Sequence, residues 1–186
     1  MKRIAIFASG TGTNAEVLIR HFEMHRNAQV TLLVSNKADA GALNIAREYG
    51  VETMVVDRER FFSANSISDE LKVRGIDLIV LAGFLWLIPP ALIKEFSGKI
   101  VNIHPALLPK FGGKGMYGKH VHAAVLSAGE KESGITVHFV NERFDEGEHI
   151  AQFTCAVDAG DTIETLAAKV QRLEHEHFAG AIERLL

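Results

Sequence analysis

The segment RIAIFASGTGTN, residues 3–14, decides the fold that we expect for this chain. An apolar run typical of a buried strand ends at two glycines, and an amphipathic pattern typical of a helix begins at Asn14. The same alternation recurs over strands at 29–35, 52–57, 77–84 and 99–104 and helices at 39–49, 66–74 and 89–96. It predicts an α/β fold: a Rossmann-like, doubly wound, mostly parallel sheet with helices on both faces.

The C-terminal third follows a less regular pattern. A helix at 120–127, strands at 135–140 and 149–157 and a final helix from Thr162 are predicted there. The two strands are joined by the short turn NERFDEG, residues 141–147, which favours some antiparallel pairing. Because no repeat or linker divides the 186 residues, we expect a single domain over 1–186.

Composition limits the possible partners. A net charge of −3 without a Lys/Arg run disfavours nucleic acid, so small molecules are the expected partners. The chain has one cysteine, Cys155, which excludes an intrachain disulfide and CxxC motifs. No run of about 20 apolar residues predicts a membrane span. We therefore expect a cytoplasmic protein with no membrane partner, whereas the oligomeric state is left open.

The first candidate site is the glycine loop SGTGTN, residues 9–14. Glycines before a helix N-terminus expose backbone N–H groups to an anion. Ala15 stands at the third glycine of GxGxxG, so a monophosphate is favoured over a dinucleotide. Thr13 and Glu16 predict a capping box for the helix. The alternative is a tight turn that binds nothing.

The second candidate site is NIHP, residues 102–105. In a strand, Asn102 and His104 project to the same face, and Pro105 favours an extended backbone at His104. Residues at the carboxyl ends of parallel strands line ligand crevices, so an amide donor and an imidazole would meet a ligand there. The alternative is that both residues cap a rigid proline turn.

The third candidate is Asp145 in the turn between two strands. A carboxylate facing an imidazole raises its pKa, which would make His104 a usable acid near neutral pH. An ordinary hairpin aspartate is the alternative. The histidine pairs 120/122 and 175/177 are two residues apart on predicted helices and diverge, so no catalytic metal is expected.

Seven segments in order resemble the phosphoribosylglycinamide formyltransferase family, a folate-dependent group of enzymes. They are SGTGTN (9–14), SNKADAGAL (35–43), VLAGF (80–84), NIHPALLPKFGG (102–113), SGITVHFV (133–140), FDEG (144–147) and KVQRLEHE (169–176). The resemblance spans the whole chain and implies the formyltransferase fold. It also implies transfer of the formyl group of 10-formyltetrahydrofolate to the amine of glycinamide ribonucleotide in purine biosynthesis.

The resemblance also implies roles for particular residues. Asn102, His104 and Asp145 would form the catalytic set, with two donors to the developing oxyanion and a carboxylate that tunes His104. The substrate phosphate would be held by Gly12, Thr13 and Asn14, and the rest of that substrate by Glu174. The folate would be bound by Leu85, Trp86, Leu87, Ile88, Asn102, Val140, Asn141 and Asp145.

Two departures from the family pattern concern folate binding and access to the site. Trp86 stands where relatives often carry Arg, so its ring would stack on the aminobenzoyl group instead of holding the glutamate tail. The loop at 110–119 is longer than in many members and could close over substrate between Gly112 and Gly118.

Three other functions stay open at this stage. Hydrolysis of 10-formyltetrahydrofolate and formylation of methionyl-tRNA are disfavoured, because those relatives usually carry an extra N-terminal or C-terminal domain that we do not expect here. The third function is a non-catalytic module that binds a phosphoribosyl ligand through the glycine loop alone.

Overall fold

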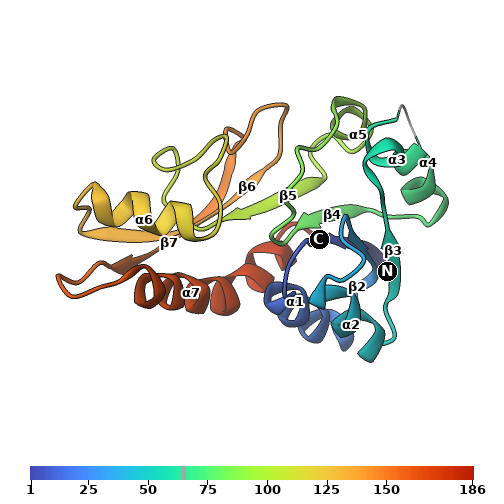
Figure 1. Ribbon diagram of the computed structural model, residues 1–186. Helices are drawn as coiled ribbons and strands as arrows, with labels where there is room; N and C mark the ends of the chain where they lie inside the picture. The colour runs from blue at the N-terminus through green and yellow to red at the C-terminus, as the bar shows by residue number, and fades with distance from the viewer. Residues whose placement is uncertain (64–65) are drawn as a thin grey trace. The chain divides into compact units, whose positions relative to one another are not determined.

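The computed structural model describes residues 1–63 and 66–186 (Figure 1). Its strands form a seven-stranded sheet in the order β3-β2-β1-β4-β5-β6-β7, flanked by helices. The strands pair in parallel in the first half and antiparallel between β6 and β7. The predicted fold class is therefore confirmed, including the antiparallel pairing in the C-terminal third.

The chain divides into two compact units, residues 1–101 with Leu186 and residues 102–185. The expectation of one domain over 1–186 stays a prediction. The first unit contains β1 (Lys2–Phe7), α1 (Thr13–Glu23), β2 (Ala28–Ser35), α2 (Gly41–Glu48), β3 (Glu52–Val55), α3 (Arg58–Phe62), α4 (Ser66–Val73), β4 (Leu78–Leu81) and α5 (Pro90–Glu95). Strand β5 (Ile100–His104) begins in the first unit and ends in the second.

The parallel sheet of the first unit is built on strands whose side chains are buried on both faces. The last four residues of β1 and all of β4 are buried, as expected for crossover connections that place helices over a sheet. Helices α1 and α2 pack on each other and on β2, while α3, α4 and α5 form a second group (Figure 1). The buried rings of Phe7 and Phe61 meet edge to face, with centroids 6.4 Å apart.

The second unit consists of the end of β5 followed by α6 (Lys119–Ser127), β6 (Glu132–Phe139), β7 (His149–Ala156) and α7 (Ile163–Glu183). Strands β6 and β7 are antiparallel, with Thr136 opposite Gln152 and a register shift between Val137 and His138. Helix α7 packs on both strands and on α6. Its N-cap is Thr162, whose side chain accepts from the backbone of Thr165 in a capping box.

The local predictions failed at two places. The short helix α3 was not predicted, because its apolar residues, Phe61 and Phe62, are adjacent and show no helical period. The capping box of Thr13 and Glu16 is wrong, since the N-cap of α1 is Gly12 and no side chain caps that helix among the described residues.

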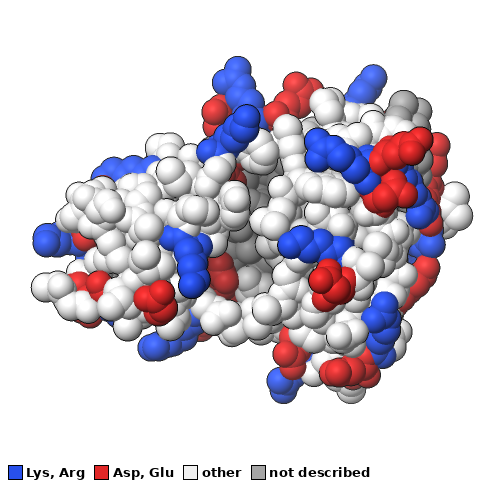
Figure 2. Space-filling model, in the orientation of Figure 1, with Lys and Arg blue, Asp and Glu red and all other residues white. Residues whose placement is uncertain are grey.

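None of the helices within residues 1–63 and 66–186 is long and apolar enough to cross a membrane. On the face shown in Figure 2, Lys and Arg side chains lie among Asp and Glu side chains and form no continuous basic area.

Candidate active site

Asn102 and His104 lie at the carboxyl end of β5, on one face of the strand, as their spacing predicts. The side chain of His104 is 4% exposed, whereas Asn102 is half-buried. A nearly buried imidazole requires polar partners, because an unpaired buried polar group costs about 1–3 kcal/mol.

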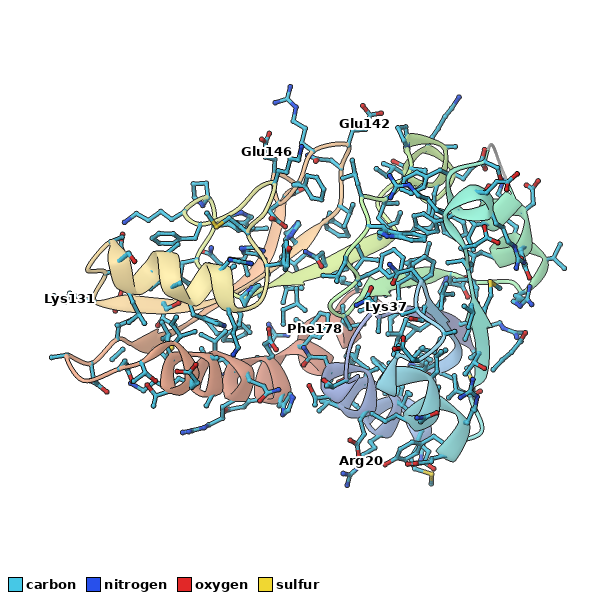
Figure 3. All side chains as sticks on the ribbon, viewed as in Figure 1. Arg20, Lys37, Lys131, Glu142, Glu146 and Phe178 are labelled. Carbon is cyan, nitrogen blue, oxygen red and sulfur yellow. The ribbon has the colours of Figure 1, made fainter. Side chains whose placement is uncertain are left out.

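Asp145 supplies the carboxylate from the connection between β6 and β7. Its backbone is in the left-handed region, with φ of 57°, which few residues other than glycine, Asn and Asp adopt readily. The side chain is 11% exposed and accepts a hydrogen bond from the backbone N–H of Gly113 at 2.9 Å. Glu142 and Glu146, in the same connection, are exposed and project from it (Figure 3). The turn therefore buries one carboxylate selectively.

Asn102, His104 and Asp145 meet within the second unit. Nδ1 of His104 lies 3.4 Å from Oδ2 of Asp145, and Nδ2 of Asn102 lies 3.5 Å from Oδ1 of the same carboxylate. These three residues are separated by up to 43 positions in the chain, so their meeting is a product of the fold. It favours a shared chemical role over a proline-turn cap and a separate hairpin aspartate.

His138 completes the network on the side of Asn102. Its Nδ1 is 2.8 Å from the carbonyl oxygen of Phe139 and therefore carries the proton. Its Nε2 lies 3.2 Å from the amide Nδ2 of Asn102 and 3.6 Å from Oδ1 of Asp145. One ring nitrogen is thus held by a backbone carbonyl, and the other lies against both Asn102 and Asp145.

Both ring nitrogens of His104 face oxygen atoms that can only accept. Nε2 lies 2.8 Å from the carbonyl oxygen of Phe111, and Nδ1 faces Asp145. Two acceptors are satisfied together only when both nitrogens carry protons, that is, in the imidazolium. Phe111 holds its carbonyl in this position with a positive φ of 56°.

The prediction that the pKa of His104 would be raised is wrong. Burial lowers the pKa of His104, and this outweighs Asp145 and the Phe111 carbonyl, which raise it. The net pKa lies below the usual 6.5. The expected sign of the carboxylate's effect is right, but the sequence could not show how deeply the ring is buried. With a lower pKa, a smaller fraction of His104 is protonated at neutral pH, but each protonated ring is a stronger acid.

Asp145 is ionised across the neutral range. Burial raises its pKa, but His138, the charge of His104 and the N–H of Gly113 together lower it below 3.8. The site therefore holds a permanent negative charge beside His104.

Burial of two histidines predicts a loss of stability in mild acid. The pKa of His122 on α6 is also lowered, by burial and by the charge of His104. Below pH 6.5, His104 and His122 bind protons more readily in the unfolded chain than in the folded protein. The free energy of unfolding therefore falls as the pH falls. Urea unfolding at several pH values between 7.5 and 5.5 measures this slope.

His122→Gln should make that slope shallower, whereas His120→Gln, at an exposed position on the same helix, should keep the wild-type slope. An unchanged slope in His122→Gln would contradict the assignment of the acid sensitivity to this buried ring.

The glycine loop lies in the first unit and fits an anion. Gly12 has φ of 88°, and a Cβ atom added there would lie 2.5 Å from the Cα of Ala42, so only glycine fits. No side chain caps α1 at Gly12 within the described residues, and a helix N-terminus is a favourable position for an anion. Thr13 and Asn14 are the first two residues of that turn.

Gly12→Ala is expected to destabilise the protein by about 2 kcal/mol or more, because a clash with the backbone adds to the unfavourable positive φ. Gly10→Ala, two residues earlier, is the matched control, since no atom lies within 4 Å of an added Cβ there. Urea midpoints of the two variants measure the difference. Equal midpoints would show that the close contact with Ala42 is not a constraint.

The segment Leu85–Ile88, expected at the folate pocket, follows β4 and is tied to the glycine loop. Ser9 Oγ accepts from the N–H of Leu85 at 3.0 Å and donates to Asn36 at 2.6 Å. Leu85 is 48% and Leu87 36% exposed, whereas Ile88 is buried. Only the two leucines therefore offer exposed apolar walls.

The ring of Trp86 belongs to an aromatic cluster in this unit. Its centroid lies 5.3 Å from that of Phe61, 5.8 Å from Phe62 and 6.2 Å from Phe84. Phe62 also carries the guanidinium of Arg58 over its face, 5.2 Å from the centroid. Trp86 is half-buried, so its partners in this structure are these rings.

The remaining predicted residues lie in the second unit. Val140 and Asn141 follow β6 and are half-buried. The Asn141 side-chain oxygen accepts from the N–H of Arg143 at 2.9 Å, as is typical of a turn. Glu174 lies on α7 and is half-buried.

Three groups of this site were missed in the sequence: His138, the carbonyl of Phe111 and the N–H of Gly113. A histidine in the apolar run ITVHFV was an available signal for His138, because a polar ring in a buried strand requires a partner. No signal could identify the two backbone groups, since they depend on how the loop after β5 folds back.

The formyl transferase family matches residues 2–182. A chloroplastic phosphoribosylglycinamide formyltransferase of Arabidopsis thaliana is 42% identical over 97% of this chain, which spans 64% of the length of that relative. The phosphoribosylglycinamide formyltransferase of Bacillus subtilis is 35% identical, with 100% of this chain and 95% of the relative covered.

The crystal structure of glycinamide ribonucleotide transformylase 1 from Geobacillus kaustophilus superposes with a TM-score of 0.91 at 38% identity. The match covers 100% of this chain and 99% of that one. The NIHP and FDEG segments thus belong to a sequence that is related along nearly its whole length to one group of enzymes. This chain is a member of the formyl transferase family.

Proposed function

We propose that the protein transfers the formyl group of 10-formyltetrahydrofolate to the amine of glycinamide ribonucleotide, as the names of its relatives indicate for those proteins. The proposal rests on one observation: the side chains of Asn102 and His104 both lie beside the carboxylate of Asp145. An amide donor, a titratable imidazole and a fixed negative charge suit the transfer of an acyl-type group to an amine.

In the proposed reaction the substrate amine attacks the formyl carbon, and negative charge develops on the formyl oxygen. Two donors, Nδ1–H of His104 and Nδ2–H of Asn102, point toward the same region beside Asp145. Their contacts with the carboxylate, 3.4 and 3.5 Å, are long for hydrogen bonds, so a better acceptor can take them over. The formyl oxygen would be that acceptor.

The tetrahedral intermediate then collapses: the attacking amine nitrogen loses one proton, N10 of the folate gains one, and the bond between the formyl carbon and N10 breaks. The amine is itself the nucleophile, so the step requires no Ser or Cys. His104 would stabilise the oxyanion as the imidazolium, and Asp145 would increase the fraction of molecules that hold this proton. The contact with His138 would hold the Asn102 amide in the orientation that places its second N–H beside Asp145.

The binding roles are proposed for each unit separately. In the first unit, Gly12, Thr13 and Asn14 would bind the substrate phosphate, and Leu85–Ile88 would bind the folate rings. In the second unit, Glu174 would bind the ribose or glycinamide part. Backbone groups of Val140 and Asn141, together with Asn102 and Asp145, would bind the pterin. We also infer a cytoplasmic location, which the single cysteine supports.

The test is an assay of the purified protein with each substrate alone and with both together, in which the formylated amine and free formate are measured separately. Formylated product only when both substrates are present supports the proposal. Release of formate at a similar rate without the amine would instead indicate a hydrolase. Binding of the ribonucleotide without turnover and without influence of folate would indicate a binding module.

A further inference from the structure

A pocket of about 290 Å³ opens in the second unit, and neither Asn102, His104 nor Asp145 lines it. The loop after β5, the end of α6 and the start of β6 form its walls. Its volume is close to the lower end of the range for small-molecule sites, about 300–1,000 Å³. The pocket therefore has room for a ligand of roughly ten non-hydrogen atoms.

The interior of the pocket is mostly apolar and firmly supported. Its apolar lining is Leu107, Leu108, Phe111 and Val125, and the buried Ser133 also lines it, with an Oγ that has no hydrogen-bond partner among the described residues. The backbone N–H of Leu108 donates to Thr136 Oγ1 at 3.0 Å, and its carbonyl accepts from the Gln152 side chain at 3.0 Å. Because β6 and β7 hold the loop in this way, the wall is formed before any ligand binds.

The charged residues around the pocket are predominantly acidic. Lys110 pairs with Glu130 at 2.8 Å, and both line the pocket. The third charged residue that lines the pocket is Glu132. It is exposed and makes no ion pair with any residue in 1–63 or 66–186. Thr136, four residues further along β6, faces the loop after β5. Glu132 lies on the same face of the strand as Thr136. The net charge of these three side chains is negative.

The pocket is distinct from the active site. Glu132 and His138 lie six residues apart on β6, which corresponds to about 20 Å along an extended strand. One wall nevertheless belongs to both, because Phe111 lines the pocket while its carbonyl contacts Nε2 of His104.

We propose that this pocket is a binding site for a small organic cation, an ammonium ion on a short apolar body. The body packs on Leu107, Leu108 and Val125, and the ammonium group lies beside Glu132. An anion of the same shape would meet the uncompensated carboxylate, so the site discriminates by charge.

The test uses the whole protein labelled with 15N and three probes of one shape: 2-phenylethylammonium, 2-phenylethanol and 3-phenylpropionate. A ligand of this size supports a dissociation constant of about 1 mM. The proposal predicts saturable shifts of the amide signals of Lys110, Phe111 and Glu130 with the ammonium probe. The alcohol should bind more weakly, and the carboxylate should leave these signals unchanged.

Two exposed substitutions should change the affinity in opposite directions. Glu132→Gln should weaken binding of the ammonium probe by about threefold, and Lys110→Gln should strengthen it by a similar factor, because it releases Glu130 from its pair. Glu23→Gln, at an exposed position on α1, is the matched control and should leave the affinity unchanged.

No saturable shift of these signals, equal binding of the carboxylate probe, or an affinity that Glu132→Gln and Lys110→Gln leave unchanged would each overturn the proposal. Equal losses in Glu132→Gln and Glu23→Gln would do the same, since they would reveal a general effect of net charge.

Discussion

His104→Ala is expected to lower kcat for formyl transfer by about a thousandfold. The substitution removes the donor that stabilises the developing oxyanion and the only group in the set that can supply a proton. Since this stabilisation acts on the transition state, kcat should fall while KM for the ribonucleotide changes little. Steady-state kinetics at saturating folate measure both values.

Two comparisons separate this effect from loss of folding. His120→Ala changes an exposed histidine on α6 and should retain wild-type kcat. Asn102→Ala removes the second donor and should lower kcat by about a hundredfold. If folded His104→Ala, checked by its urea midpoint, kept more than about a tenth of the wild-type kcat, His104 could not have the proposed role.

Asp145→Asn has the second largest expected effect, a loss of about a hundredfold in kcat/KM at pH 7.5. The carboxylate raises the pKa of His104 against the effect of burial. Without it, the pKa of His104 falls further, and a smaller fraction of the enzyme carries the imidazolium at neutral pH. The limb of the pH profile in which activity declines with rising pH should therefore shift to lower pH.

The matched control for this substitution is Glu146→Gln, which removes a neighbouring carboxylate in the same connection. Glu146 is exposed and projects from the connection (Figure 3), and among the described contacts it pairs only with exposed Arg143, at 3.2 Å. Its variant should keep the wild-type profile. A shift of the limb to higher pH in Asp145→Asn would contradict the account, because it would mean that the carboxylate disfavours the imidazolium.

The sheet and the donor pair could be predicted because each rests on a short-range pattern. Buried runs that alternate with amphipathic stretches specify parallel strands and crossover helices. Asn102 and His104 share a face through the two-residue period of a strand, which needs no tertiary information. Asp145 is a candidate from its turn, but only the family resemblance favours it over an ordinary hairpin aspartate, because the spacing within the turn does not show which carboxylate is turned inward.

The electrostatics of the site could not be predicted either, because they depend on the tertiary structure. The sequence indicated an acid–base pair, but the pKa of His104 depends on how much water the surrounding chain excludes. The carbonyl of Phe111 and the ring of His138 reach the site through a loop with a positive φ and through a strand on another part of the sheet. Their roles follow from the three-dimensional arrangement alone.

Asp145 raises the pKa of the buried His104 above the value that burial alone would give. An NMR titration of the His104 imidazole in the wild type and in Asp145→Asn measures this contribution. We expect a pKa below 6.5 in the wild type and a still lower pKa in the variant. An equal or higher pKa in Asp145→Asn would contradict it.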